Sequence, residues 1–208
     1  GGAADQKIYR ERPGNGSKVM TRTAECQACR AADIKVFYRV EKIPTHSVLL
    51  LPTREKAISY PIGNIHLGYC QQCGFISNLA FDPELQEYEA EYESTQRYSA
   101  TFDSFSRQLT SDLVARHNLK GKTILEIGCG NGEFLVSLCE AGANRGIGFD
   151  PAYVAGRVPT DAAVTFVKDF YSEKYTHHQA DFVVCKMTLE HIPNVAEFME
   201  MIARALKD

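Results

Sequence analysis

The chain has 208 residues, of which 44% are hydrophobic and 24% charged, and its formal net charge at pH 7 is -3. This composition predicts one good core with a smaller second one, and the charge disfavours a general binder of polyanions. The longest early apolar patch, residues 48–51, is too short to span a bilayer. The first residues also lack the apolar core of a signal peptide, so we expect a cytoplasmic protein without a membrane segment.

Residues 1–80 contain two Cys-x-x-Cys pairs, Cys26 with Cys29 and Cys70 with Cys73. Seven cysteines without a secretory signal make a disulfide framework a poor interpretation. Four thiolates are instead the ligand set of a closed tetrahedral zinc site. Because protein ligands fill every position, the predicted zinc is structural and stabilises a domain whose apolar core is small.

Other interpretations of the cysteines are small buried side chains or a redox pair. Two pairs in one short segment favour the metal. His46 and His66 are possible substitute ligands, but the four thiols already complete a tetrahedral shell. The remaining cysteines have no such spacing, and we expect them to be buried or to lie in a glycine-rich loop: Cys129, Cys139 and Cys185.

Residues 81–120 are predicted to be a helical connector. Their first part is an acidic run that contrasts with the excess of Lys and Arg in residues 1–80. Between residues 98 and 117, apolar side chains then recur at steps of three and four, which predicts an amphipathic helix.

Residues 121–208 alternate short apolar runs with helical patterns. Strands are expected over 123–127, before Asp150, before Asp169 and in "ADFVVCKM", with helices ending at Gly142 and starting at Val195. This rhythm indicates right-handed parallel crossovers. The fold class is therefore α/β, a doubly wound, mostly parallel Rossmann-like sheet of about four strands with ligands at their carboxyl ends, preceded by the small β-rich zinc domain.

The turn after the first of these strands reads "LEIGCGNGEF", with Gly128, Gly130 and Gly132. A dinucleotide fingerprint would place its third glycine one position later, where this chain has Glu133. An acidic side chain there suits a pyrophosphate poorly, so a dehydrogenase is the weaker alternative. The stretch closely resembles the first motif of class I S-adenosylmethionine-dependent methyltransferases.

That resemblance implies a cofactor site built from residues at the ends of successive strands. Asp150 would accept hydrogen bonds from the two ribose hydroxyls, Asp169 and Phe170 would hold the adenine, and Glu126 would lie near the cationic end of the cofactor. Each could also be an ordinary loop residue, but their order and spacing together favour the cofactor interpretation.

The cysteine pairs, the "YP" and "CGF" around the second pair, the connector "FDPELQEYEAEYES" and the glycine motif together resemble sugar C-methyltransferases with an N-terminal zinc-binding domain. This resemblance covers nearly the whole chain and implies a nucleotide-linked ketosugar, or a similar small molecule, as substrate. Such chemistry needs a base, and His191 in "TLEHIPN" is the candidate, with Glu190 orienting it or sharing the proton. Alternatively, His191 caps the following helix or packs near the cofactor.

Two alternatives of other classes remain. An RNA base methyltransferase with a zinc module would use the basic excess of residues 1–80, although the acidic run makes nucleic acid an unlikely partner. A non-catalytic module would retain only the cofactor pocket. Methyltransferase sheets of this class usually have more strands, so we expect residues 121–208 to be the first part of a domain that continues beyond Asp208 in the native protein.

Overall fold

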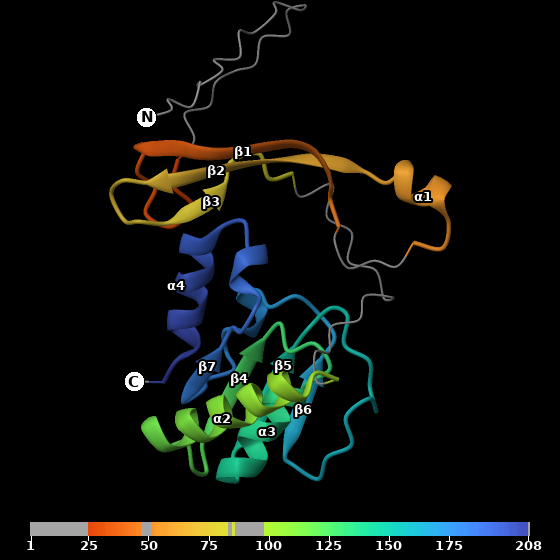
Figure 1. The fold of residues 1–208 in the computed structure, drawn as a ribbon. Coiled ribbons are helices and arrows are strands. Elements are labelled where there is room, and N and C mark those ends of the chain that lie inside the picture. The colour runs from red at the N-terminus through yellow and green to blue at the C-terminus, as the bar shows by residue number, and fades with distance from the viewer. Residues whose placement is uncertain (1–24, 47–50, 83–84, 86–97, 208) are drawn as a thin grey trace, which may run out of the picture.

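The computed structural model describes residues 25–46, 51–82, 85 and 98–207. Within these residues the chain forms two sheets, a three-stranded antiparallel one and a four-stranded parallel one (Figure 1). Most of the acidic run predicted after residue 81 lies outside the described residues. None of the described helices is long and apolar enough to cross a membrane.

The antiparallel sheet contains β1 (Ile34–Pro44), β2 (Ile62–Cys70) and β3 (Ile76–Asn78), in that order. A short helix, α1 (Arg54–Ile58), lies between β1 and β2 in the chain. The predicted turn after Cys70 is present: the N–H of Gly74 donates to the Cys70 carbonyl at 2.9 Å. Gly74 has φ +82°, a conformation that glycine adopts without steric cost.

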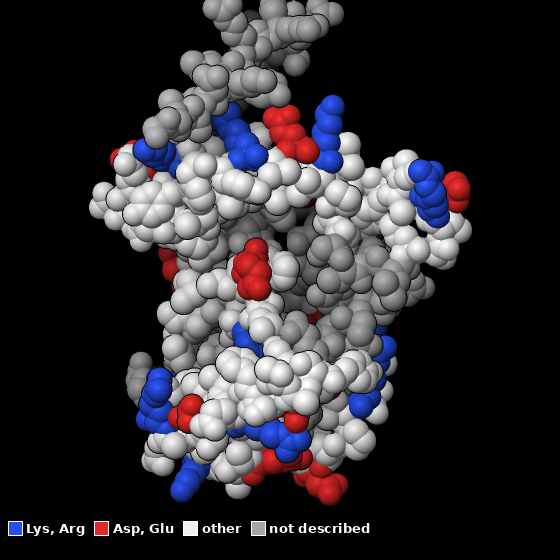
Figure 2. Space-filling view, viewed as in Figure 1, with Lys and Arg blue, Asp and Glu red and all other residues white. Residues whose placement is uncertain are grey.

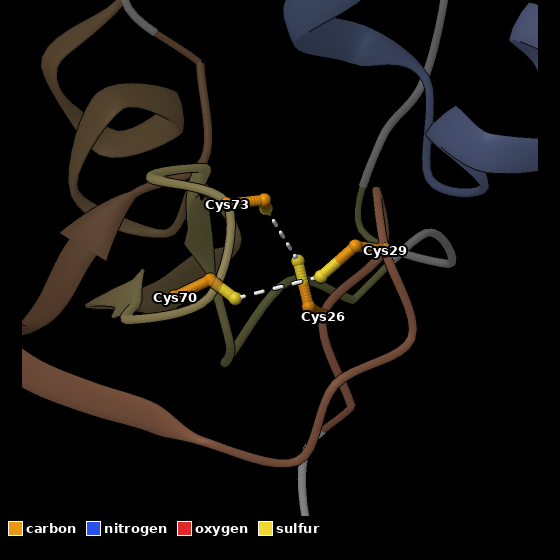
Figure 3. Close-up of side chains that lie close together, drawn as sticks. All are labelled: Cys26, Cys29, Cys70 and Cys73. Carbon is orange, nitrogen blue, oxygen red and sulfur yellow. Dashed lines mark hydrogen bonds between the residues drawn. The ribbon is translucent and has the colours of Figure 1, made fainter.

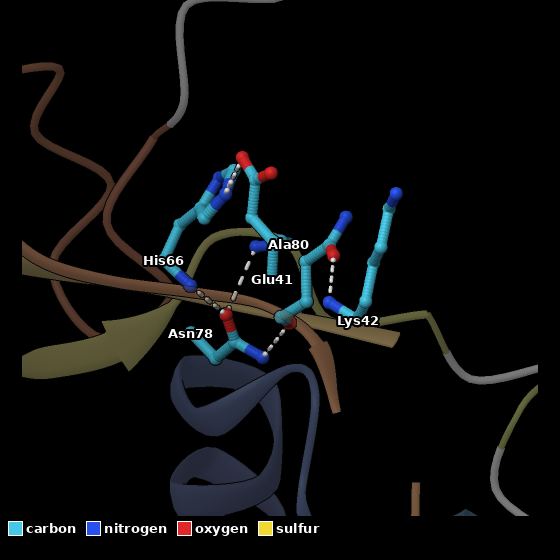
Figure 4. A network of polar contacts seen from close by, with 6 residues as sticks. Glu41, Lys42, His66, Asn78 and Ala80 are labelled. Carbon is cyan, nitrogen blue, oxygen red and sulfur yellow. Dashed lines mark hydrogen bonds and ion pairs between the residues drawn. The ribbon is translucent and has the colours of Figure 1, made fainter. Parts of the chain in front are cut away.

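Asn78 connects the strands of this sheet through its side-chain amide (Figure 4). Its Oδ1 accepts the N–H groups of His66 at 2.8 Å and of Ala80 at 3.1 Å, and its Nδ2 donates to the Asn64 carbonyl at 3.1 Å. One side chain thus satisfies three backbone groups where β3 is too short to do so. Such local hydrogen bonds compensate for the small apolar core that the sequence predicted for this part of the chain.

The parallel sheet confirms the predicted α/β arrangement. Its strands are β4 (Thr123–Ile127), β5 (Arg145–Phe149), β6 (Val164–Val167) and β7 (Phe182–Val184), in the spatial order β6-β5-β4-β7. All three neighbouring pairs are parallel. Two single turns of 3-10 helix, η2 (Glu173–Tyr175) and η3 (Leu189–His191), lie on either side of β7 in sequence.

Helices cover both faces of this sheet. On one face Ile124 packs with residues of α2 (Ala100–Arg116) and α3 (Glu133–Gly142). On the other face Leu125 packs with residues of α4 (Val195–Ala205). Successive strand residues point to opposite faces, so both sides of β4 are buried. The helix predicted over 98–117 is therefore a layer of the parallel-sheet unit, as well as the segment that leads into it.

Candidate functional site

The glycine loop between β4 and α3 has a backbone that only glycine adopts readily. Gly128, Gly130 and Gly132 have φ values of +71°, +56° and +85°. A methyl group on Gly128 would lie 2.1 Å from Thr188 Oγ1, and one on Gly132 would lie 2.3 Å from the Phe166 ring. Both the conformation and the close packing of Thr188 and Phe166 therefore require glycine at these two positions.

Asp150 follows β5 and ties the glycine loop to that strand. Its Oδ2 accepts the N–H of Gly130 at 2.8 Å, and its Oδ1 accepts the N–H of Ala152 at 2.8 Å. An ionised carboxylate has about four acceptor positions, so about two remain for a ligand with paired hydroxyls. The side chain is thus held in place by backbone groups and keeps the capacity to accept further hydrogen bonds.

Glu126 lies in the middle of β4, opposite Gly148 of β5 and Val184 of β7. It is 2% exposed, and its Oε2 has no hydrogen-bond partner among the described residues. Burial raises the pKa of this carboxyl to about 8, although the charge of Lys186 and the backbone N–H of Leu135 act in the opposite direction. A buried acid at the base of the glycine loop is an expensive feature unless a cation stabilises it.

Lys186 is a charged residue of this region that the sequence analysis missed. Its Nζ lies 5.1 Å from the centre of the Phe134 ring, at the start of α3, and 5.8 Å from the Phe102 ring in α2. It is also the cation whose charge lowers the pKa of Glu126. The available signal was a single lysine two residues after the end of an apolar strand, at the edge where ligands bind.

Asp169 and Phe170 follow β6. The Asp169 carboxylate forms an ion pair with Lys174 and accepts the Tyr175 hydroxyl at 2.8 Å, and these two hydrogen bonds lower its pKa. Phe170 is 58% exposed. Asp169 is therefore already engaged by its own loop, and the predicted adenine contacts of both residues stay a prediction.

Glu190 and His191 lie in η3, between β7 and α4, and both are exposed. The His191 backbone N–H donates to the Thr188 carbonyl at 2.9 Å. The alternative in which the His191 side chain caps the following helix is wrong, because Asn194 holds the N-cap position of α4 and no side chain caps that helix. The segment that carries His191 begins beside the glycine loop, since Thr188 contacts Gly128.

The four cysteines of the two Cys-x-x-Cys pairs lie together at one end of the antiparallel sheet (Figure 3). Their sulfur atoms are all within 4.8 Å of one another; the Cys26 and Cys73 sulfurs are 3.7 Å apart and those of Cys29 and Cys70 3.6 Å apart. Cys26 and Cys70 are buried, while Cys29 and Cys73 are exposed. The described histidines that the sequence offered as substitutes are not in this cluster, nor are the other cysteines.

A parallel sheet with a glycine loop after its first strand, and a carboxylate hydrogen-bonded to that loop after its second, is the arrangement of Rossmann-like domains, in which ligands lie at the carboxyl ends of the strands. Residues 98–208 match the family model described as "Methyltransferase domain". The chain belongs to this family and carries a domain of S-adenosylmethionine-dependent methyltransferases, a class of enzymes. The match begins just before α2 and leaves the antiparallel sheet outside.

Several curated proteins are similar to part of the chain. The nodulation protein NoeA of Rhizobium meliloti (strain 1021) is 36% identical over 80 residues, which are 38% of this chain and 16% of that protein. The ubiquinone biosynthesis O-methyltransferase of Erwinia tasmaniensis is 30% identical over 110 residues, a match that covers 48% of this chain and 44% of that protein. The protein of that name in Escherichia fergusonii is 31% identical over 96 residues, a match that covers 43% of this chain and 40% of that protein. The chain spans less than half the length of each of these relatives.

Proposed function

We propose that this chain is part of an enzyme that transfers a methyl group from S-adenosylmethionine to a small molecule, by C-methylation of a nucleotide-linked sugar or a similar acceptor. The observation that carries the proposal is the hydrogen bond from the Gly130 N–H to Asp150. It holds a carboxylate with spare acceptor positions beside the glycine loop, and the family match supplies the class of cofactor.

The residues present fit this cofactor. Asp150 would accept the ribose hydroxyls, and the three glycines would allow close approach of the aminoacyl part. The buried and unpartnered Oε2 of Glu126 fits a nearby positive charge. Asp169 and Phe170 would contact the adenine. When bound, the cofactor supplies an electrophilic methyl group on a sulfonium.

The acceptor needs a base, and we propose His191 for this role with Glu190 beside it. An exposed imidazole at the carboxyl edge of the sheet is accessible to a substrate, and imidazole is the most common general base in enzymes. Its nitrogen would remove a C–H proton next to the sugar carbonyl. The carbanion left behind would be the nucleophile that accepts the methyl group supplied by the cofactor when it is bound.

The cysteine cluster fits a structural zinc ion. Tetrahedral zinc with Zn–S bonds of about 2.3 Å has sulfur atoms about 3.8 Å apart. The sulfur atoms of Cys26 and Cys73 are 3.7 Å apart, and those of Cys29 and Cys70 are 3.6 Å apart. Without a metal, burial raises the pKa of Cys26, but hydrogen bonds within the cluster lower it to about 7 and raise the pKa values of Cys29 and Cys73, so one thiol of the four ionises first. In this proposal residues 1–80 form the zinc domain, 81–120 the connector and 121–208 the methyltransferase part.

Calorimetry of cofactor binding tests the central part of the proposal. S-adenosylhomocysteine should bind and NAD should not, and Asp150→Ala should weaken binding by about tenfold to a hundredfold, as expected for the loss of a charge-assisted bidentate contact. Asp161→Ala, which removes an exposed carboxylate between β5 and β6, is the matched control and should bind normally. Equal affinities for the wild type and the Asp150 variant would remove Asp150 from the site.

The alternative functions have their own tests. On the face in Figure 2, Lys and Arg are interspersed with Asp and Glu among the described residues, which gives no support there to a track for RNA phosphates. Retention of RNA that falls steeply with salt would nevertheless favour an RNA methyltransferase. Cofactor binding without turnover of any acceptor by the complete native protein would favour a non-catalytic module.

A further inference from the structure

Residues 188–196, here called the linking segment, follow β7, carry Glu190 and His191 and end in the first two residues of α4. At its first end Thr188 lies against the glycine loop, so closely that a methyl group on Gly128 would overlap its hydroxyl. At its last end the backbone N–H of Ala196 donates to the carbonyl of Gln27 at 2.9 Å. The linking segment is thus held by the glycine loop on one side and by the cysteine cluster on the other.

The hydrogen bond from the Ala196 N–H to Gln27 satisfies a backbone donor in the first turn of α4. The first N–H groups of a helix have no partner within it, and a side chain at the N-cap usually satisfies one of them. Asn194 holds that position but makes no such bond. The Gln27 carbonyl therefore caps α4 from a distant part of the chain, and Figure 1 shows α4 between the two sheets, in a position to receive it.

Gln27 lies between Cys26 and Cys29, in residues 26–31, which are here called the cysteine turn. The conformation of this turn therefore sets the direction of the Gln27 carbonyl. Within this turn the N–H of Arg30 donates to the Cys26 carbonyl at 2.8 Å, and the N–H of Cys26 donates to the Ala31 carbonyl at 2.8 Å. A second contact lies further along the same helix, where Arg30 and Glu200 are 4.0 Å apart. Both of these side chains are mostly exposed, so the pair adds little by itself.

We propose that the cysteine turn positions the linking segment: by capping α4 through Gln27, the metal-bound turn fixes Glu190 and His191 relative to the glycine loop. Gln27 acts as a positioning residue through its backbone. This inference rests on the proposed function for the metal and for His191, and it adds that loss of the metal loosens the linking segment as well as the small sheet.

Hydrogen exchange followed by mass spectrometry tests the coupling on the purified, zinc-loaded protein. Ala196→Pro removes the donor of the capping bond, and proline is tolerated in the first turn of a helix because no intrahelical bond is lost there. The matched control is Glu197→Pro, one position later in the same turn, which keeps the Ala196 N–H. We expect amides of residues 189–195 to exchange about fivefold faster in the first variant, the effect of one lost hydrogen bond, and to change by less than about twofold in the control.

Removal of zinc with a chelator gives a second measurement that needs no variant. In the wild type it should accelerate exchange in residues 189–195, whereas in Ala196→Pro it should add little there, because the connection is already broken. Two results would overturn the coupling. One is that amides of residues 189–195 exchange equally fast in both proline variants, and the other is that zinc removal leaves their exchange in the wild type unchanged. A protein that contains no zinc by metal analysis would instead refute the metal part of the proposed function, and with it this inference.

Discussion

Replacing Glu126 by glutamine should change how stability depends on pH. Burial raises the pKa of this carboxyl from 4.5 to about 8. The unfolded chain loses the proton near pH 4.5 and the folded protein only near pH 8, so stability falls as pH rises through this interval. At about 1.4 kcal/mol per pH unit, protonated Glu126 contributes about 5 kcal/mol to the free energy of unfolding. This contribution is fully present below pH 4.5 and fully lost above pH 8. Glutamine has nearly the same size but no charge, so the variant should be more stable than the wild type at pH 8 and similar to it near pH 4.5.

Urea unfolding without cofactor at several pH values between 4.5 and 8.5 measures this effect. Other groups titrate in the same range, but they are present in both proteins and cancel in the difference. Glu55→Gln, an exposed position on α1, is the control and should follow the wild type. If wild type and Glu126→Gln lose stability in parallel as pH rises, Glu126 is ionised throughout, and the argument from its burial is wrong.

The remaining predictions concern the metal, the glycine loop and the base. Cys70→Ser should remove about one zinc per molecule, by metal analysis, and unfold the small sheet, because three thiolates leave the shell open. Gly132→Ala should abolish detectable S-adenosylhomocysteine binding in calorimetry, whereas Gly121→Ala, with a similar positive φ but open space around it, should retain it. His191→Asn should lower turnover and substrate exchange with deuterated water by ~100-fold to 10,000-fold without changing cofactor affinity, and His177→Asn, at another exposed histidine, should leave both unchanged.

Each of these has a contradicting result. Full zinc content in the Cys70 variant would exclude that thiol as a ligand. Equal losses in the two glycine variants would mean that backbone strain, and not the close neighbour of Gly132, decides the effect. Retained exchange in the His191 variant would assign the base to another residue, and lost cofactor affinity would assign His191 to the cofactor pocket.

The sequence predicted the parts of the fold that follow from local pattern. The β4 strand, the glycine loop and α3 are set by a short apolar run, three glycines at fixed spacing and a helical period, and all lie where expected. The cysteine spacing likewise predicted the cluster, because four soft ligands in two turns have few other uses. Contacts between distant parts of the chain left no such signal. The capping of α4 by Gln27 involves a backbone carbonyl, which every residue carries, so no residue type marks it.

Lys186 and Asp169 show a second limit. A lone lysine has no motif, and its relation to Glu126 appears only when β7 and β4 are side by side. Asp169 stands at the expected strand end, but the nearby Lys174 and Tyr175 engage its carboxylate. The motif predicted the position of Asp169 at the end of a strand. It could not predict that neighbouring side chains would already donate hydrogen bonds to the Asp169 carboxylate.

The order of the parallel strands places β5 and β7 on opposite sides of β4. From β4 the chain extends the sheet in one direction through β5 and β6, and it then crosses back to place β7 on the opposite side. The loops that follow β4 and β7 lead to helices on opposite faces of the sheet, α3 and α4, although Thr188 brings the two loops into contact at Gly128. In the proposed function, the cofactor contacts on the first loop and the base on the second come from separate stretches of sequence. Because Thr188 lies against Gly128, a larger side chain at position 188 should also disturb the glycine loop, so the two sides of the proposed site are not free to vary independently.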